Sequence, residues 1–169
     1  MFSSDSFQHV SLIGLALSAR RIASGIMHGS VDVRPIETPD CWWAGSVHPN
    51  RGYVLTCRGQ IVAEVVEFDG RQWADWVMPY DSEGAEIFRS ALVAETDAAH
   101  AVAETVRSLE SGGCTVDAAG VNVIGQAVGE EPAAWLEYED ADGRRDRAYF
   151  HGAAEAEACL RWARAHDLA

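Results

Sequence analysis

The sequence predicts an α+β fold in which antiparallel meander sheets pack against helices and an N-terminal helix precedes them. Three observations support this prediction. Apolar residues recur at helical spacing between Leu12 and Ile26, the apolar period changes to two from Tyr53 onward, and the helical period returns between Ala99 and Leu109. Because strands followed by a helix recur in the rest of the chain, the body is either one α+β domain or two similar meander-plus-helix units.

The N-terminal helix is predicted from candidate caps followed by an apolar stripe. Ser4, Asp5 and Ser6 are candidate N-caps. The stripe consists of Leu12, Ala16, Ala19, Ala23 and Ile26. Gly29 marks the expected end of the helix, after about five turns. The following segment, VDVRPIETPD, contains proline and has no helical period, so we assign residues 1–30 to the helix and residues 31–50 to a connector.

Residues 51–169 form the predicted body, which begins with a meander. The strands predicted from a period of two are Tyr53–Cys57, Ile61–Phe68 and Gln72–Met78, with EIFRSALVA as a candidate fourth. Asp69-Gly70 supplies the positive φ of a tight hairpin. Thr96 or Asp97 is expected to cap a helix that ends at Gly112-Gly113. Its apolar stripe consists of Ala99, Val102, Ala103, Val106 and Leu109.

The rest of the body repeats this order. The segments VNVIGQAV, AAWLEYED and RDRAYF are predicted strands, and GAAEAEACLRWARAHDLA is a predicted closing helix. The inward-facing residues of that helix are expected to be Ala156, Cys159, Leu160 and Ala163. If the body is two similar units, they divide as residues 51–112 and 114–169.

The charge of the chain restricts its partners. The 169 residues carry a net charge of −13, and all 13 cations are Arg. Residues 1–60 contain 5 Arg against 4 acids, whereas residues 61–169 contain 8 Arg against 22 acids. This excess of acids argues against direct binding of nucleic acid, because few cations are available to displace counterions from phosphate. It favours a basic protein as the partner.

The cysteines and the N-terminal segment indicate a reduced, cytoplasmic protein. The four cysteines have no C-x-x-C spacing, and no metal ligand set or cofactor motif is present. The apolar run SLIGLALSA has no Arg or Lys before it and breaks at Arg20-Arg21. It therefore fits neither a signal peptide nor a membrane span. We expect no cofactor, no metal, no membrane contact, and a monomer or homodimer.

The segment LEYEDADGRRDRAYF raises three alternatives, a calcium loop, a catalytic carboxylate cluster or a solvated hairpin. With Gly143 at position 6 of an EF-hand-type loop, positions 1 and 12 are Tyr138 and Tyr149, so two ligands are missing. Glu137 and Glu139 alternate with apolar residues, as on a strand with one wet face. Asp142-Gly143 is typical of a hairpin turn. We therefore predict a hairpin.

The histidines leave an enzyme or ligand-binding protein open as an alternative. His151 follows a predicted strand, and His48 lies near Cys41, so either could line a pocket. Asp97, His100 and Glu104 share one face of a predicted helix, which is more typical of a polar outer face than of a metal site. No nucleophile elbow, P-loop or zinc-protease motif occurs, so no catalytic residue is assigned.

The acids and two tryptophans give the leading functional hypothesis, a small acidic inhibitor that occupies a partner's basic nucleic-acid-binding surface. Acids at alternate strand positions repeat at about 6.6 Å, comparable with phosphate spacing. An anti-defence protein of a phage or mobile element, or an immunity protein, would have this role. A third alternative is an assembly protein that uses the N-terminal helix. The predicted partner-binding residues are Glu137, Glu139, Asp140, Asp142, Glu64, Glu67, Asp69, Trp42 and Trp43.

Overall fold

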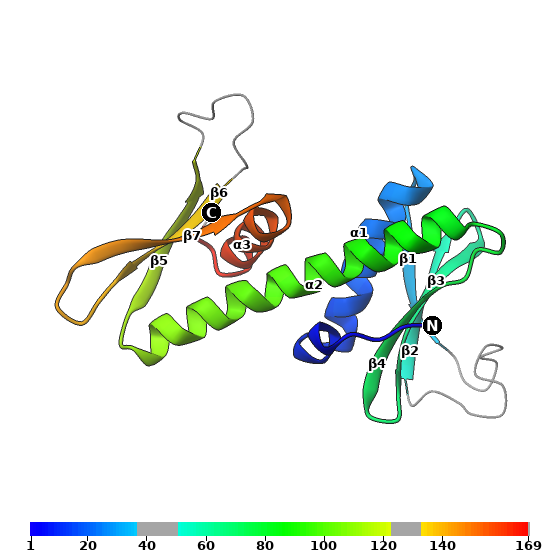
Figure 1. The fold of residues 1–169 in the computed structure, drawn as a ribbon, viewed down its shortest axis with the longest axis horizontal. Coiled ribbons are helices and arrows are strands. Elements are labelled where there is room, and N and C mark those ends of the chain that lie inside the picture. The colour runs from blue at the N-terminus through cyan, green and yellow to red at the C-terminus, as the bar shows by residue number, and fades with distance from the viewer. Residues whose placement is uncertain (37–50, 123–132, 169) are drawn as a thin grey trace. The chain divides into compact units, whose positions relative to one another are not determined.

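A computed structural model describes residues 1–36, 51–122 and 133–168. It confirms the α+β fold with antiparallel meander sheets, one of four strands and one of three (Figure 1). The chain divides into two compact units, Met1–Thr96 and Asp97–Ala169. The boundary falls inside the long helix α2 (Ser82–Ser111), so the first part of this helix belongs to one unit and the second part to the other.

The first unit is a four-stranded sheet with helices packed against it. Its elements before α2 are the 3-10 helix η1 (Asp5–His9), the helix α1 (Leu12–Met27), and the strands β1 (Asp32–Pro35), β2 (Arg51–Cys57), β3 (Gln60–Phe68) and β4 (Arg71–Trp76). The strands are antiparallel and lie in the order β1-β2-β3-β4. Helix α1 packs against β2 and β3. Leu15, Leu55 and Val65 are fully buried in the resulting core.

The N-terminal helix begins later than predicted. The chain first forms η1, and the side chain of Ser11 then accepts a hydrogen bond from the backbone N–H of Gly14 at 3.0 Å. Ser11 is therefore the N-cap of α1, and the candidates Ser4, Asp5 and Ser6 are not. The helix ends at His28, which has the left-handed conformation. The predicted inward face is confirmed at Leu12, Ala16, Ala19 and Ala23, which are all buried, whereas Ile26 is only half-buried.

The meander is confirmed, and the predicted connector contributes a strand of its own. Strand β1 lies inside the segment assigned to the connector and pairs with β2. Four residues ending in proline are too short to show a period of two, so the sequence gives no strand signal there. The β3–β4 hairpin turns on Asp69-Gly70 as predicted, with φ values of 51° and 72°.

Helix α2 begins at Ser82, so the fourth strand predicted at EIFRSALVA is wrong, as is the helix start at Thr96 or Asp97. The burial of Phe88 and Leu92 explains why this segment is a helix. The two residues are four apart, so they share one face of a helix, and both are fully buried in the core of the first unit. Thr96 continues the same buried line and donates its hydroxyl to the carbonyl of Leu92 at 2.8 Å.

The second unit contains a three-stranded sheet and a helix after the second part of α2. Its elements are β5 (Thr115–Val121), β6 (Ala133–Glu139), β7 (Arg145–His151) and α3 (Ala153–Ala165). The core includes Val102, Leu136 and Phe150. Strand β5 ends at Val121, where the strand VNVIGQAV was predicted to begin, and residues 123–128 lie outside the described residues. The closing helix is confirmed, with Ala156, Cys159 and Ala163 buried and Leu160 half-buried.

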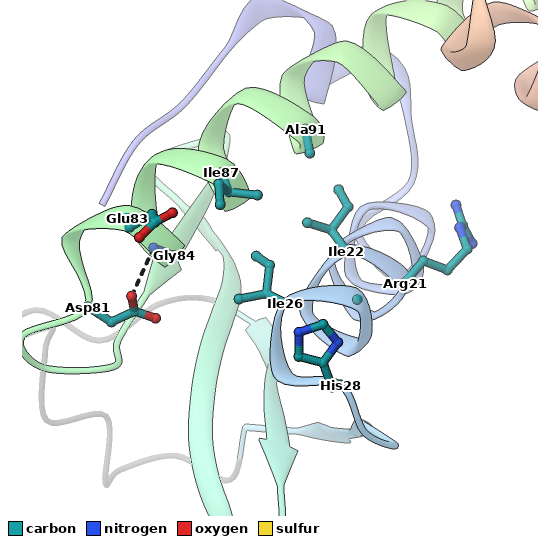
Figure 2. A pocket seen from close by; sticks show the side chains of 10 residues that line it. Arg21, Ile22, Ile26, His28, Asp81, Glu83, Gly84, Ile87 and Ala91 are labelled. Carbon is teal, nitrogen blue, oxygen red and sulfur yellow. Dashed lines mark hydrogen bonds between the residues drawn. The ribbon is translucent and has the colours of Figure 1, made fainter.

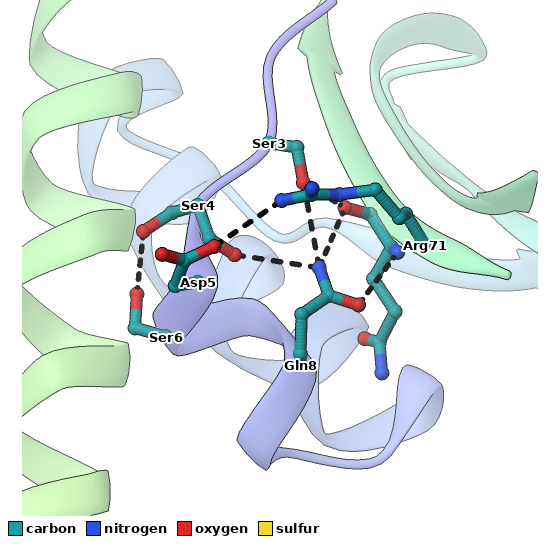
Figure 3. Close-up of polar contacts among 7 residues, drawn as sticks. Ser3, Ser4, Asp5, Ser6, Gln8 and Arg71 are labelled. Carbon is teal, nitrogen blue, oxygen red and sulfur yellow. Dashed lines mark hydrogen bonds and ion pairs between the residues drawn. The ribbon is translucent and has the colours of Figure 1, made fainter.

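The N-terminal segment closes one edge of the four-stranded sheet. Phe2 and Ala74 exchange two backbone hydrogen bonds of 2.9 Å, so the outer edge of β4 has a partner. Side-chain contacts also hold this segment against β4. Gln8 Oε1 accepts from the backbone N–H of Gln72 at 3.2 Å, and Asp5 pairs with Arg71 at 3.3 Å (Figure 3). The edge is therefore occupied by the chain itself.

Candidate binding groove and acidic hairpin

A groove of about 580 Å³ lies in the first unit between α1 and the start of α2 (Figure 2). It is open to solvent and is lined from two segments that are distant in sequence. The segment from α1 supplies Arg21, Ile22, Gly25, Ile26 and His28. The segment that begins α2 supplies Asp81, Glu83, Gly84, Ile87 and Ala91.

The inside of the groove is apolar. Ile22 and Ile26 extend from α1 toward Ile87 and Ala91 of α2, and all four side chains point into the same space (Figure 2). Ile87 is 47% exposed, which is high for an isoleucine on a helix that contributes to the core. The groove therefore offers apolar surface that the isolated protein leaves in contact with water.

Gly25 widens the groove at the middle of its α1 wall. A Cβ atom added at this position would meet nothing within 4 Å. Neither the packing of the core nor a close approach to another part of the unit requires glycine here. Because glycine in a helix interior is less favourable than alanine by roughly 0.5–1 kcal/mol, the open position has a small energetic cost.

The two ends of the groove differ in charge. Arg21 turns its guanidinium away from the groove and donates from Nε to Glu95 Oε1 at 3.0 Å, so its charge is compensated. At the start of α2, Asp81 accepts from the backbone N–H of Gly84 at 2.9 Å and from the indole of Trp76 at 3.2 Å. Glu83 is exposed beside it. The positive end of the α2 dipole tolerates both acids, so this end of the groove is acidic.

The titratable residues that line the groove are Arg21, His28, Asp81 and Glu83. Among the residues that the structure describes, no group of three or more His, Cys, Asp or Glu side chains could hold a metal ion. The arrangement can bury apolar side chains and attract a cation at one end.

The hairpin predicted at LEYEDADGRRDRAYF is confirmed as β6 and β7, paired antiparallel. Its register sets Glu137 opposite Arg147 and Glu139 opposite Arg145. Arg145 donates to Glu137 and Glu139 at 3.2 Å each, and to Asp117 of β5 at 2.9 Å. Asp117 is the largest cause of the raised pKa of Arg145. The alternating acids are therefore matched by arginines across the sheet.

The guanidinium of Arg147 completes this pairing on the same face. Its Nε donates to Glu137 Oε2 at 3.0 Å, and its Cζ lies 3.9 Å from the centroid of the Trp135 ring. The hydrogen bond to Glu137 is the main cause of the raised pKa of Arg147. A surface on which each strand acid has an arginine partner is a poor mimic of a row of phosphates.

The turn of the hairpin is held by Asp140. One carboxylate oxygen of Asp140 accepts from the backbone N–H groups of Asp142 and Arg144, each at 2.9 Å. Gly143 has a φ of 78°, as the Asp-Gly turn predicted. Asp142 is exposed at the tip. Asp140 is thus engaged in the turn, whereas the carboxylate of Asp142 faces solvent.

The predicted binding residues of the first unit have three different surroundings. Glu64 is 4% exposed, so it does not contribute to an exposed acidic surface. Glu67 pairs with Arg51 at 2.8 Å, and Asp69 is exposed in its hairpin turn. The predicted residues Trp42 and Trp43, together with Cys41 and His48, lie outside the described residues.

The other candidate residues do not line the groove. His151 is exposed at the end of β7, where its ring stacks on Tyr149 with the centroids 6.3 Å apart. On α2, Asp97 is exposed, His100 is half-buried, and Glu104 pairs with Arg107. The groove itself was missed by the sequence analysis. Ile22 and Gly25, which lie off the buried stripe of α1, are the residues that could have indicated it.

No protein-family model, curated protein or solved structure matches this chain. Among the described residues, no helix has the length and apolar character needed to cross a membrane.

Proposed function

We propose that this protein is a small acidic binding domain that holds an apolar segment of a basic partner protein between α1 and α2. The observation that carries the proposal is the apolar groove with two acids, Asp81 and Glu83, at one end. The segment that fits has apolar side chains for the floor and a Lys or Arg at the end that meets Asp81 and Glu83.

The apolar floor supports a binding role because it supplies a driving force. Ile22, Ile26 and Ile87 would each lose water contact when a segment occupies the groove. Burial of apolar surface contributes roughly 25 cal/mol per Å² before the cost of association is subtracted. A few large apolar side chains of the partner would supply the matching surface.

Gly25 supports the same role because it leaves the backbone of α1 accessible to a partner. The free protein has no steric need for glycine at this position, since a Cβ atom there would meet nothing within 4 Å. A partner segment that approaches the α1 backbone closely would require it, because any side chain would then stand in the way. Binding would thus give the glycine at this position of the helix interior a role.

The charge of the chain favours a basic partner. A net charge of −13 attracts basic proteins over distances of about a Debye length and raises the association rate. If the bound segment lies beside a nucleic-acid-binding surface of the partner, its occupation would inhibit nucleic-acid binding. That inhibition is the role we propose for an anti-defence or immunity protein of this kind. Because the hairpin acids are paired with arginines, we assign the binding to the groove.

Selection from a displayed library of random peptides tests the proposal and does not require the partner to be identified first. Peptides are selected on the full-length protein and counter-selected on Gly25→Leu, in which a side chain fills the groove. Enriched peptides are expected to combine apolar residues with Lys or Arg at one end, and to bind Gly25→Leu at least roughly ten-fold more weakly. Peptides that bind both proteins equally, or a selection that enriches none, would refute the groove as the binding site.

A matched pair of charge reversals tests the acidic end. Glu83 lines the groove and Glu86 does not, although both are exposed on the first turns of α2. Glu83→Arg is expected to weaken the selected basic peptides several-fold in fluorescence anisotropy at low salt, and less at high salt. Glu86→Arg should have little effect. Equal weakening by both variants would mean that net charge, rather than the groove, attracts the peptides.

A further inference from the structure

The two edges of the four-stranded sheet differ in their backbone pairing. The outer edge of β4 is paired with Phe2, whereas in the residues that the structure describes no strand pairs with the outer edge of β1. Asp32, Arg34 and Pro35 of β1 are exposed. An open edge is a template for pairing with another strand.

The backbone groups that face outward on β1 can be identified from its pairing with β2. Ile36 donates its N–H to the carbonyl of Gly52 at 2.9 Å, so Ile36 belongs to a hydrogen-bonded pair. Because such pairs alternate along an antiparallel ladder, Arg34 and Asp32 also bond to β2, and the N–H and C=O of Val33 point outward. Pro35 has no N–H to offer. Val33 is therefore the centre of the available edge.

The side chains around Val33 are complementary to themselves. If a second β1 strand pairs antiparallel through a two-fold axis at Val33, Asp32 of each copy lies opposite Arg34 of the other. Residues directly opposite each other share one face of a sheet, so both pairs join opposite charges. Neither Asp32 nor Arg34 forms an ion pair with a residue that the structure describes, and both are exposed.

Helix α1 adds apolar surface beside the same edge. Ile13 is 43% exposed and Leu17 is 39% exposed, and both line a hollow of about 500 Å³ together with Val33 and Tyr53. Because an antiparallel ladder keeps the same faces aligned, the α1 helices of two paired copies lie on the same side of the joined sheet. Their exposed residues would then face each other across the axis.

From the open edge, its self-complementary charges and the adjoining apolar residues, we propose that β1 and the Ile13–Leu17 flank of α1 bind a second copy of this chain. The interface is isologous, with the two sheets joined into one through paired β1 strands. Strand β1 offers few backbone hydrogen bonds, since it has four residues and ends at Pro35. The apolar contact of α1 with α1 therefore supplies much of the affinity. This inference does not depend on the groove between α1 and α2.

Sedimentation equilibrium of the full-length protein over a range of concentrations tests this proposal. The wild type is expected to form a dimer in a reversible, concentration-dependent way. Asp32→Arg and Arg34→Asp each place like charges opposite each other, so each variant alone should dimerise about ten-fold more weakly. Leu17→Gln should also weaken the dimer. Asp142→Arg changes the charge of the second unit by the same amount as Asp32→Arg and should leave the dimer unchanged.

A mixture of the two β1 variants provides the decisive result. In a heterodimer of Asp32→Arg with Arg34→Asp, both cross-strand pairs again join opposite charges, so the mixture should dimerise more strongly than either variant alone. Circular dichroism of each variant checks that the fold is retained. A wild type that remains monomeric at all concentrations, a dimer that the β1 variants leave intact, or a mixture no stronger than its components would overturn the proposal.

Discussion

The ring of Trp135 on β6 occupies the space in which a side chain at Gly120 on β5 would begin. A Cβ atom added to Gly120 would lie 2.4 Å from Cζ2 of Trp135, well inside van der Waals contact. Gly120 and Trp135 are directly paired across the two strands. The same ring carries the guanidinium of Arg147 over it. Glycine at position 120 is therefore a condition for the arrangement of Trp135 and Arg147.

Gly120→Ala is expected to destabilise the protein by about 1–3 kcal/mol, because the new methyl group displaces the Trp135 ring. Urea denaturation followed by far-UV circular dichroism measures the change in the free energy of unfolding. If Trp135 is replaced as well, in Gly120→Ala/Trp135→Leu, the cost of the alanine should largely disappear. An unchanged cost in the double variant would show that the steric contact is not its cause.

Gly25→Ala, unlike Gly120→Ala, is expected to stabilise the protein. The added methyl group meets nothing within 4 Å, and alanine is the better residue in the interior of α1. The free energy of unfolding should rise by about 0.5–1 kcal/mol. The same urea experiment measures it, with Gly120→Ala as the contrasting glycine. A loss of stability would mean that Gly25 has a structural role in the free protein.

The hairpin turn gives a prediction that separates two neighbouring acids. Asp140→Ala removes the acceptor of two backbone N–H groups and is expected to cost about 1 kcal/mol, whereas Asp140→Asn keeps an acceptor oxygen and should cost less. Asp142→Ala should be nearly neutral, because its carboxylate faces solvent. Thermal unfolding of the three variants ranks them. Equal losses for Asp140→Ala and Asp142→Ala would contradict the structural role of Asp140.

The strands of the two Asp-Gly hairpins could be predicted from sequence because their signals are local, whereas β1 and most of β5 were not predicted. A period of two followed by Asp-Gly defines the β3–β4 hairpin, and the same signal defines the β6–β7 hairpin. The matching of Glu137 with Arg147 also follows from sequence once the turn at Gly143 is accepted, because the turn sets the register. A count of the acids of this strand without their arginine partners overestimates its exposed charge.

The first part of α2 could not be assigned from its own residues. EIFRSALVA is a short apolar segment that fits a strand, and only its packing shows that Phe88 and Leu92 face one core. The groove could not be predicted from local sequence patterns either. Ile22 and Ile87 are distant in sequence and become neighbours only when α1 and α2 pack into the same core. A contact between residues so far apart in sequence leaves no signal in the local spacing of apolar residues.

Cys159 gives a prediction about pH. Its thiol is fully buried on α3, and burial raises its pKa from 9.0 to about 11, because the thiolate would lose its hydration. Below pH 9 the thiol is protonated in both the folded and the unfolded protein, so it adds no pH dependence. Between pH 9 and 11 the unfolded chain loses this proton while the folded protein keeps it, so stability falls as the pH rises.

Comparison with Cys159→Ala isolates this contribution, since the other ionisable groups are common to both proteins. Below pH 9 the variant is expected to be less stable by about 1–2 kcal/mol, because a buried atom is lost. As the pH rises toward 11, the wild type should lose stability faster, and the gap should narrow. Urea denaturation across this range measures both profiles. Parallel profiles would show that the Cys159 thiol ionises as readily in the folded protein as in the unfolded chain. That result would contradict the burial of this thiol in the core of the second unit.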